Sequence, residues 1–516
     1  MTRARGLVFF LVCAIPAFAG APLLAQLIDR TLAPNRAGEG IALSLDEQIG
    51  PGRGDWFIED SSSFIINRDP FRAIRRGRQL FQRKFQVVRG QGPLTLDGVG
   101  DVETVRIIGA GLSDSCASCH GRPRGSAGFG GDVVTRPDSR DAPHLFGLGL
   151  KEMLADEMTA ELRATRDQAI ALAIQRGRPI GRPLVAKGVN FGRVVGMPNG
   201  TADLSDVEGV DGDLRVRPFF AHGETTSIRE FIVGALNAEM GLQVADPDLQ
   251  AAHAGAPITT PSGMILDGGL DKVEAPPAGP GELDPAVVDY LEFYLLNYFK
   301  PGRGQETVDT ANGRKLMANL GCTTCHVPDL TIARDRRVAD VETAFDPVRG
   351  HFNRLFATAR PLFNTMQDVA GLPALKVPAQ GSFVVRDIYT DFKRHDLGPG
   401  FHELEYDGSV RRAFLTTPLW GVGSTTPYGH DGRSISLADV ILRHGGEAQE
   451  SRDRFAALSP VRQQDVVAFL NSLLLFPPDD TASNLDPGDP STPGFPQLGH
   501  GSIRLTVLFN NPMKIE

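Results

Sequence analysis

The sequence has few cysteines, a deficit of basic residues and almost no long apolar runs. Only five cysteines occur in 516 residues, and every cysteine after Cys13 belongs to a CxxCH unit, so none remains for a structural disulfide. Lys and Arg number 53 against 62 Asp and Glu, which argues against nucleic acid as a partner. The length exceeds that of one ordinary core, so we expect two or three domains.

One apolar run lies at the amino terminus and is a candidate export signal. Two arginines precede it, and Ala17-Phe18-Ala19 forms the small-x-small pattern of a cleavage site, with a second candidate at Ala25. The alternative is a membrane anchor, but Pro and Gly residues interrupt a run already short for a span of about 20 residues. We therefore expect residues 1–25 to be a signal peptide, the mature protein to be periplasmic, and no membrane span to remain.

The chain repeats one plan, loosely, in each half. The segments that begin with Gly77-Arg78-Gln79-Leu80-Phe81 and Gly313-Arg314-Lys315-Leu316-Met317 each predict a helix before a CxxCH unit. Each half then ends in an apolar helix, VVDYLEFYLL from Val287 and VVAFLNSLLL from Val466. The fold class that follows is mainly α, with two domains that differ by loop insertions.

Proline-rich segments help to set the boundaries of this plan. We predict an amino-terminal extension over 26–69, domains over 70–300 and 301–478, and a short carboxyl-terminal extension over 479–516. Apolar residues alternate from Ile503 to Phe509, which predicts one short strand in that extension.

The CASCH and CTTCH units have the pattern that attaches haem covalently. Two cysteines one helical turn apart catch the vinyl groups, and the histidine directly after them reaches the iron. Zinc or a thioredoxin-like redox pair are the alternatives, but zinc sites usually place two CxxC pairs about 15–20 residues apart, and a redox pair needs no adjacent histidine. We therefore predict two cytochrome c-like haem domains, whose attachment residues are Cys116, Cys119, His120, Cys322, Cys325 and His326.

The ligand on the second face of a haem decides between electron transfer and reaction with a small oxidant. His444 follows SLADVILR, an amphipathic helix, and lies on the same face as Leu437. That position can bring an imidazole to a buried iron. For the other histidines outside the CxxCH units, a surface or packing role is the default expectation.

Several motifs in the same order resemble one bacterial family. The run TTPLWGVGSTTPYGHDGRSISLADVILRHGGEA (416–448) is similar to the signature of the di-haem cytochrome c peroxidase and MauG superfamily, especially its di-haem oxidoreductase branch. RDAPHLFGLG (140–149), NAEMG (237–241) and HDLGPG (395–400) resemble further landmarks of that family. The resemblance extends over 70–475 and implies a peroxidase-like oxidoreductase.

The resemblance assigns different roles to the two haems. It implies that the haem on His120 is reactive and that the haem on His326 transfers electrons, with His444 at the distal position that is Met in typical peroxidases and Tyr in MauG. A bis-histidine haem has a lower potential than one with a thioether ligand. Glu239 matches the family's distal glutamate, which moves a proton between the peroxide oxygens, whereas Met240 is expected to pack, with iron binding as its alternative.

The chain departs from the family pattern near the reactive haem. Residues 121–143 contain no histidine, so the iron is expected to be open from the start, and His144 is an alternative ligand that we expect to pack instead. The family's tryptophan between the haems is replaced by Phe219 and Phe220. Electron transfer then lacks that relay, unless Trp420 assists.

A calcium ion is also typical of the family, and the positions that resemble its ligands are Asp141, Thr425 and Pro427. Three positions do not complete the six to eight oxygen ligands that calcium takes. The same motif contains His430, expected to form a hydrogen bond near the site, and Arg433, expected to contact a haem propionate.

The leading function is peroxide reduction, or use of peroxide or another small oxidant on an organic or protein substrate as in MauG-like and rubber-cleaving relatives. Because the chain is acidic, the expected electron donor is a small basic protein such as a cytochrome c or a cupredoxin. A homodimer is one assembly compatible with the sequence. The rival is a plain electron-transfer cytochrome with a second strong ligand on the His120 haem. Its candidate ligands are Met153, Met158, Met197, Met240, His144 and His222.

Overall fold

The computed structural model describes residues 44–85, 113–121, 141–276, 281–298, 302–304, 306–341, 359–405 and 407–475. The predicted signal peptide, the carboxyl-terminal extension with its expected strand, and most of the histidine-free segment at 121–143 lie outside these residues. Within the described part of the chain, no helix is long and apolar enough to cross a membrane.

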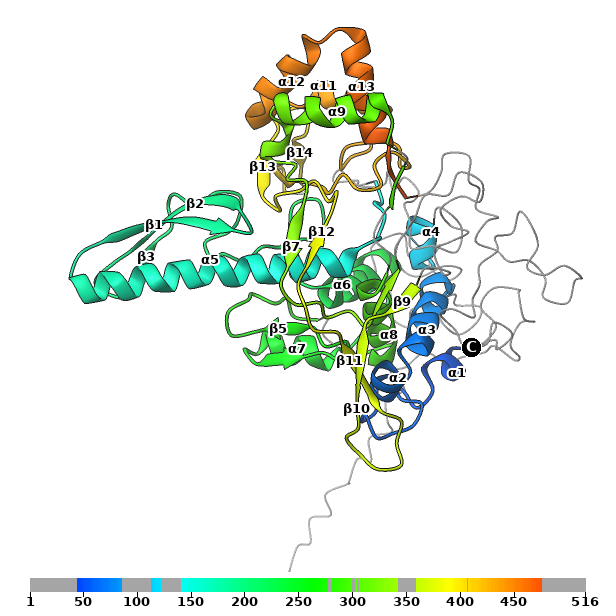
Figure 1. Ribbon diagram of the computed structural model, residues 1–516. Helices are drawn as coiled ribbons and strands as arrows, with labels where there is room; N and C mark the ends of the chain where they lie inside the picture. Colours follow the sequence, from blue (N-terminus) through cyan, green and yellow to red (C-terminus); the bar gives the residue numbers. More distant parts are fainter. Residues whose placement is uncertain are drawn as a thin grey trace, which may run out of the picture.

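Figure 1 shows helices in both halves of the described fold. Those of the amino-terminal half are α1 (Leu45–Ile49), α2 (Ser62–Arg68), α3 (Pro70–Gln82), α4 (Cys116–His120), α5 (Leu148–Arg176), α6 (Ile228–Met240), α7 (Pro247–His253) and α8 (Pro285–Leu296). Those of the carboxyl-terminal half are α9 (Val308–Asn319), η2 (Cys322–Thr324), α11 (Leu437–Arg443), η4 (Gly446–Ala448), α12 (Gln449–Ala456) and α13 (Pro460–Asn471).

Each half contains a helix crossing centred on a glycine. In the first, α3 packs against α8, and a Cβ added to Gly77 would lie 2.2 Å from the carbonyl oxygen of Tyr290. In the second, α9 packs against α13, and a Cβ on Gly313 would lie 1.9 Å from the carbonyl oxygen of Asp465. Glycine therefore lets both pairs of helices approach until backbone meets backbone. These are the helices that the sequence repeat predicted.

The mainly α prediction understates the strands. The described residues form one three-stranded sheet and seven two-stranded sheets. The strands before residue 330 are β1 (Ile180–Ala186), β2 (Val189–Gly196), β3 (Ala202–Asp203), β4 (Pro257–Thr259), β5 (Ile265–Asp267) and β6 (Gly302–Arg303). Those that follow are β7 (Leu330–Ile332), β8 (Ala339–Val341), β9 (Ala359–Pro361), β10 (Phe363–Met366), β11 (Leu375–Pro378), β12 (Phe383–Val385), β13 (Arg394–Asp396), β14 (Glu403–Leu404), β15 (Val410–Arg411), β16 (Ala413–Leu415) and β17 (Leu473–Leu474). Most have two to four residues, too few for alternation to reveal them.

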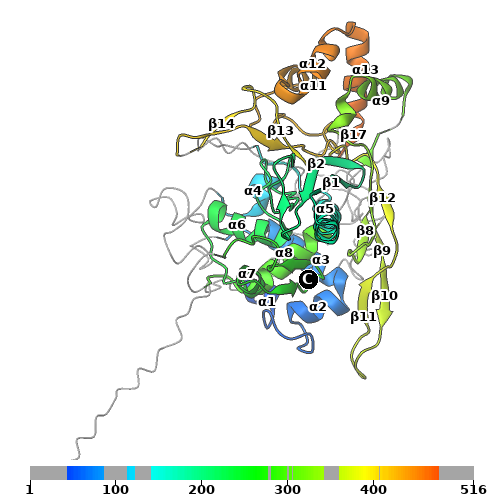
Figure 2. The same ribbon diagram turned by 90° about the vertical axis from the view of Figure 1, so that its left-hand side faces the viewer.

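Three of these strand pairs, β7 with β12, β8 with β9 and β10 with β11, form a ribbon along the amino-terminal half (Figures 1 and 2). At its far end Arg68 forms an ion pair of 3.0 Å with Asp368, and the ammonium of Lys376 donates to the Arg68 carbonyl over 2.6 Å. The ring of Phe71 also meets that of Phe363 edge to face. The ribbon thus ties the second half to the first.

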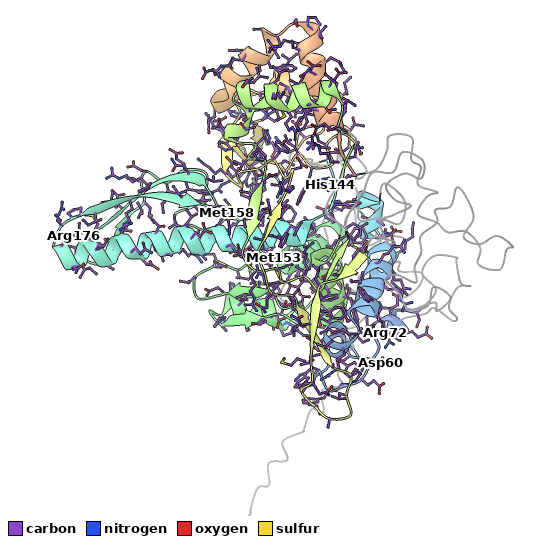
Figure 3. All side chains as sticks on the ribbon, viewed as in Figure 1. Asp60, Arg72, His144, Met153, Met158 and Arg176 are labelled. Atoms are coloured by element: carbon purple, nitrogen blue, oxygen red, sulfur yellow. The ribbon has the colours of Figure 1, made fainter. Side chains whose placement is uncertain are left out.

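The helix α5 carries a projecting arm. It starts beside the core and runs outward, where β1 and β2 pack on its carboxyl-terminal part (Figures 1 and 3). Close packing there depends on Gly196, because a Cβ at that position would lie 2.2 Å from the Ala169 carbonyl carbon. Lys151, considered below, lies near the opposite, amino-terminal end of α5.

A fully buried ionic cluster lies between α6 and α8. The guanidinium of Arg229 bonds the carboxylates of Asp246 (2.7 Å), Asp289 (2.8 Å) and Glu292 (3.0 Å), and all four side chains are without solvent exposure. Asp246 also caps α7. Because each buried charge has an opposite partner, this cluster fixes the two helices together without leaving an isolated ion in the core.

Candidate functional site

The first CxxCH unit is the short helix α4, which contacts α3. Nδ1 of His120 lies 2.7 Å from the carbonyl oxygen of Pro143 and therefore donates to it. Burial lowers the pKa of His120 to about 4, so its ring is neutral. A neutral imidazole with its proton on Nδ1 has a free lone pair on Nε2, the form that binds a metal.

The second CxxCH unit folds as η2 with Cys325 at its end and is held by a hydrogen bond from the His326 amide to the Cys322 carbonyl, 3.0 Å. Nδ1 of His326 donates to the carbonyl oxygen of Tyr389 over 3.1 Å. Burial is the main cause that lowers the pKa of this histidine to about 4, and the neighbouring His444 contributes to the same shift. His326 therefore repeats the arrangement of His120.

His444 ends the helix α11, whose first turn is capped by the hydroxyl of Ser436. Its Nδ1 donates to the carbonyl of Val440, 2.7 Å away, and its ring meets that of Phe401 edge to face. Burial lowers the pKa of His444 as well. The structure thus brings His444 near His326, with Nε2 of both available. His253 makes a similar bond to Val273 but lies exposed on α7.

The four cysteines of the two units are free thiols in this structure. Burial raises the pKa of Cys116 to about 12 and that of Cys322 to about 11. Burial is also the main cause that raises the pKa of Cys119. A thioredoxin-like pair needs a thiol with a lowered pKa, so these environments disfavour the redox alternative. Paired thiols next to a neutral imidazole fit covalent haem attachment.

Glu239 lies in the last turn of α6, half-buried, beside the first CxxCH unit. Its carbonyl oxygen accepts a hydrogen bond of 3.0 Å from the amide of Ser113, three residues before Cys116. Its charge is one of the causes, after burial, that raise the pKa of Cys119. The next residue, Met240, is buried in the core. The structure therefore brings the predicted catalytic carboxylate to the first unit and not to the second.

His144 has hydrogen bonds at both ring nitrogens. Its Nε2 lies 3.0 Å from the carbonyl oxygen of Trp420, and its Nδ1 accepts from the amide of Phe146 at 3.3 Å. Both bonds occupy the positions through which a histidine binds a metal. This geometry favours the packing role for His144 over the alternative of iron binding.

Two of the three predicted calcium positions lie side by side. Asp141 and Pro427 lie together, because a Cβ on Gly432 would come within 3.3 Å of the Asp141 Cβ and 3.1 Å of the Pro427 Cγ. The amide of Asp141 also bonds the His430 carbonyl, 3.1 Å. Thr425, two residues before Pro427, instead directs its hydroxyl toward the carbonyl of Val422 at 3.5 Å.

His430 and Arg433 also have protein partners. Nε2 of His430 lies 2.9 Å from a carboxylate oxygen of Glu403, and its ring stacks on Phe414 with centroids 4.0 Å apart. Arg433 lies 3.4 Å from Asp431 with its side chain 67% exposed. His430 thus lies close to Glu403 and Phe414, but its Nε2 makes no hydrogen bond within the described residues, and the hydrogen-bonding role stays a prediction.

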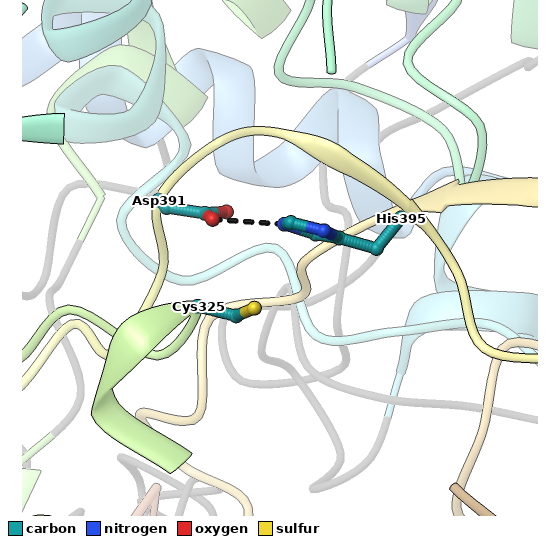
Figure 4. Close-up of side chains that lie close together, drawn as sticks. All are labelled: Cys325, Asp391 and His395. Carbon is teal, nitrogen blue, oxygen red and sulfur yellow. Dashed lines mark hydrogen bonds and ion pairs between the residues drawn. The ribbon is translucent and has the colours of Figure 1, made fainter. Parts of the chain in front are cut away.

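Two residues that sequence reasoning passed over lie beside Cys325. A dashed line in Figure 4 joins His395 to Asp391, and Nε2 of His395 lies 2.9 Å from a carboxylate oxygen of Asp391. The Cys325 sulfur, a carboxylate oxygen of Asp391 and a ring nitrogen of His395 all lie within 4.8 Å of one another. Although burial lowers it, hydrogen bonds to Asp391 and Cys325 raise the pKa of His395 to about 11. A metal ion there would compete with a thioether for the same sulfur. The HDLGPG motif could have drawn attention to His395, whereas Asp391 belongs to no motif recognised in the sequence.

Lys151 was also missed. This lysine, one turn into α5, places its ammonium 5.5 Å from the ring centre of Phe219, one of the two residues at the position of the family tryptophan. Burial lowers the pKa of Lys151 to about 8. Its place in a helix pattern gave no sign of this environment.

Comparison with known protein families gives a match to one region of the chain. Residues 349–473 match the family described as "Di-haem oxidoreductase, putative peroxidase". This match includes HDLGPG and the long motif that ends before Gln449, and it confirms the resemblance stated from the sequence. No curated protein matches the chain.

Two solved structures overlap more of the chain. Hydrazine synthase from Kuenenia stuttgartiensis has 12% identity and a TM-score of 0.36, covering 92% of this chain and 100% of its own. A MauG-like protein associated with microbial copper homeostasis has 14% identity and a TM-score of 0.25, covering 64% of this chain and 89% of its own. TM-scores below 0.5 do not establish a shared fold.

Proposed function

We propose that this chain, whose residues 349–473 carry the di-haem oxidoreductase signature, is an exported enzyme with two covalently attached haem c groups. One observation supports this most: the three predicted iron ligands, His120, His326 and His444, all donate Nδ1 to a backbone carbonyl. Each carbonyl fixes the ring and its tautomer, which leaves Nε2 for iron. The buried thiols beside two of these rings complete the donor set.

The two sites perform different tasks in this proposal. A haem held at each unit would supply exchange of single electrons and, where the protein provides only one ligand, binding of a small oxidant. His326 and His444 supply two imidazoles to one haem, which suits electron transfer. His120 supplies one imidazole to the other, and Glu239 lies beside that unit. We assign peroxide reduction to the His120 site.

Glu239 is the acid-base group of this reaction. Its carboxylate would accept a proton from one oxygen of hydrogen peroxide and return it to the other, which leaves as water when the O–O bond breaks. Two electrons from the donor protein and two further protons would convert the remaining oxygen to a second water. The hydrogen bond from Ser113 to the Glu239 carbonyl holds the end of α6 against the segment that leads into α4. That contact positions the carboxylate.

Electrons reach the enzyme from a small basic carrier, such as a cytochrome c or a cupredoxin, in the periplasm. The formal charge of −9 favours the approach of such a partner. Asp141, Thr425 and Pro427 are proposed to take part in one calcium site, in which Asp141 supplies the anionic oxygen. Asp141 lies beside this turn, because its amide donates to the carbonyl oxygen of His430.

The electron-carrier rival requires a second strong ligand at the His120 haem. Both ring nitrogens of His144 are engaged, Nε2 of His222 lies 3.2 Å from Glu224, and the sulfur of Met153 accepts the amide of Arg336 at 3.2 Å. Met197 lies at the end of β2 in the arm. These positions, together with the burial of Met158 and Met240 in the core, support an open iron and therefore the enzyme.

The test is mass spectrometry and paramagnetic resonance of the purified protein. We expect the mass of two haems on the polypeptide, one low-spin and one high-spin ferric signal, and consumption of peroxide with a reduced cytochrome c or cupredoxin. Two low-spin signals without peroxide consumption would select the electron carrier. Peroxide consumption only with an organic substrate would select substrate oxidation.

A further inference from the structure

The two predicted proximal ligands are joined by a short path of bonds. On one side, His120 donates to the carbonyl of Pro143, and His144 is the next residue in the chain. The imidazole of His144 then reaches the carbonyl of Trp420. His144, which follows Pro143 in the chain, therefore connects the amino-terminal half to the carboxyl-terminal half.

The other side of the path is built in the same way. His326 donates to the carbonyl of Tyr389, whose chain neighbour is Ile388. The carbonyl of Ile388 accepts the amide of Leu419 over 3.0 Å, and Leu419 directly precedes Trp420. Four hydrogen bonds and short stretches of covalent chain thus connect the two CxxCH histidines without a gap.

The central bond of this path has a defined polarity. The amide of Phe146 donates to Nδ1 of His144, so the ring proton lies on Nε2 and is donated to the Trp420 carbonyl. Burial lowers the pKa of His144 to about 4, and the ring stays neutral. A neutral, singly oriented imidazole in a buried place holds one geometry.

Packing holds Trp420 in the position in which its carbonyl accepts the hydrogen bond from His144. Its side chain is 3% exposed and belongs to the main core together with Phe146 and Leu475. Its indole lies over Gly147, where an added Cβ would be 2.8 Å from the ring. Gly147 has φ +74°, so it suits the left-handed backbone and the close approach at once. The start of α5 and residues 419–421 are thereby held as one unit.

We propose that the hydrogen bond from His144 to the Trp420 carbonyl is the electronic bridge between the two haem sites, in place of a tryptophan relay. This rests on the proposed di-haem function. With haem held at both units, this bond would carry single electrons from the His326 site to the His120 site, two in succession for each peroxide reduced there. No proton crosses, because the Nε2 proton stays on His144. The indole of Trp420 acts only as a positioning group.

The test measures electron transfer between the haems after pulse-radiolytic reduction of one of them. His144→Phe removes the donor and keeps an aromatic ring, so we expect the transfer rate to fall several-fold. The midpoint potentials and spectra of both haems are expected to stay as in the unaltered protein. His144→Gln, which keeps an amide donor, should restore part of the rate.

Trp420→Phe is the matched control, because the backbone carbonyl remains when the indole is lost. We expect a smaller loss of rate than in His144→Phe. An equal or larger loss would show that the indole carries the electron, and an unchanged rate in His144→Phe with unchanged potentials would also overturn the bridge. If His144→Phe does not fold, His144→Asn, which is too short to reach the carbonyl, makes the same comparison. Absence of two covalent haems in the unaltered protein would instead refute the proposed function.

Discussion

The two CxxCH units have the same pattern of two cysteines and one histidine, but the fold places different side chains around them. Near His326 the chain brings a second imidazole, His444, with the same backbone anchor at Nδ1. Near His120 it brings a carboxylate, Glu239, and the nearby imidazole of His144 has both nitrogens engaged. In the proposed function, the CxxCH motif therefore accounts only for the cofactor, and the side chains that follow or end α11 and α6 distinguish the two sites.

Removing the cysteines of one unit has the largest expected effect on this comparison. Cys322→Ala with Cys325→Ala should leave the polypeptide with the mass of one haem, because a single imidazole does not retain haem covalently. Cys116→Ala with Cys119→Ala should also leave one haem, but with the low-spin signal. Mass spectrometry with resonance spectra checks both variants. The same signal remaining in both would mean that the two sites do not differ.

Removing His444 should make the second site resemble the first. In His444→Ala we expect the low-spin ferric signal to be lost or converted to high spin, since one of two imidazoles is gone, while the signal of the His120 haem is unchanged. His253→Ala is the matched control, because His253 has the same type of Nδ1 bond but is exposed on α7. A low-spin signal untouched by His444→Ala would contradict the assignment.

Removing the charge of Glu239 tests the other side of the comparison. Glu239→Gln should slow the reaction with peroxide by ~10²-fold, the scale for losing one acid-base group. Cyanide needs no such proton transfer, so its binding should be nearly unchanged and should not require prior reduction. Rapid-mixing spectra measure both rates. A peroxide rate equal to that of the unaltered protein would remove Glu239 from the mechanism.

The smallest effect concerns the two helix crossings. Gly77→Ala and Gly313→Ala each push a Cβ into the backbone of the facing helix, and we expect a loss of about 1–3 kcal/mol in the free energy of unfolding, as for other overpacked cores. The control is Gly234→Ala in α6, where an added Cβ meets nothing within 4 Å. Denaturant unfolding compares them. A control as destabilised as Gly77→Ala would refute the packing argument.

The sequence was informative where local pattern sets local structure. The glycine-led helices, their apolar partners and the helix before His444 all occur, because periodic apolar residues specify helices within one segment. Candidate ligands beside a CxxCH unit were likewise readable from motifs. The anchors of their rings were not, because the carbonyls of Pro143 and Tyr389 are far from His120 and His326 in the chain and carry no side-chain signal.

Contacts between different segments also could not be predicted from the sequence pattern. Asp391 pairs with His395 across one turn of irregular backbone, and no periodicity marks such a pair. The strands β7 and β12 have three residues each and pair across more than one intervening hairpin. Such short strands show no recognisable alternation of apolar and polar residues, so the sequence does not predict them. The bond between His144 and Trp420 joins the two halves and depends on the whole fold.

The ribbon that ends at Asp368 and Lys376 has a consequence for how the molecule unfolds. Since both residues hold Arg68 in the amino-terminal half, the carboxyl-terminal half cannot separate without exposing Arg68, which is fully buried, and breaking its ion pair. Loss of one half therefore removes partners from the other, and the free energies of the two are coupled. Heating should produce a single cooperative transition, in which the ribbon makes the stability of each half depend on the other.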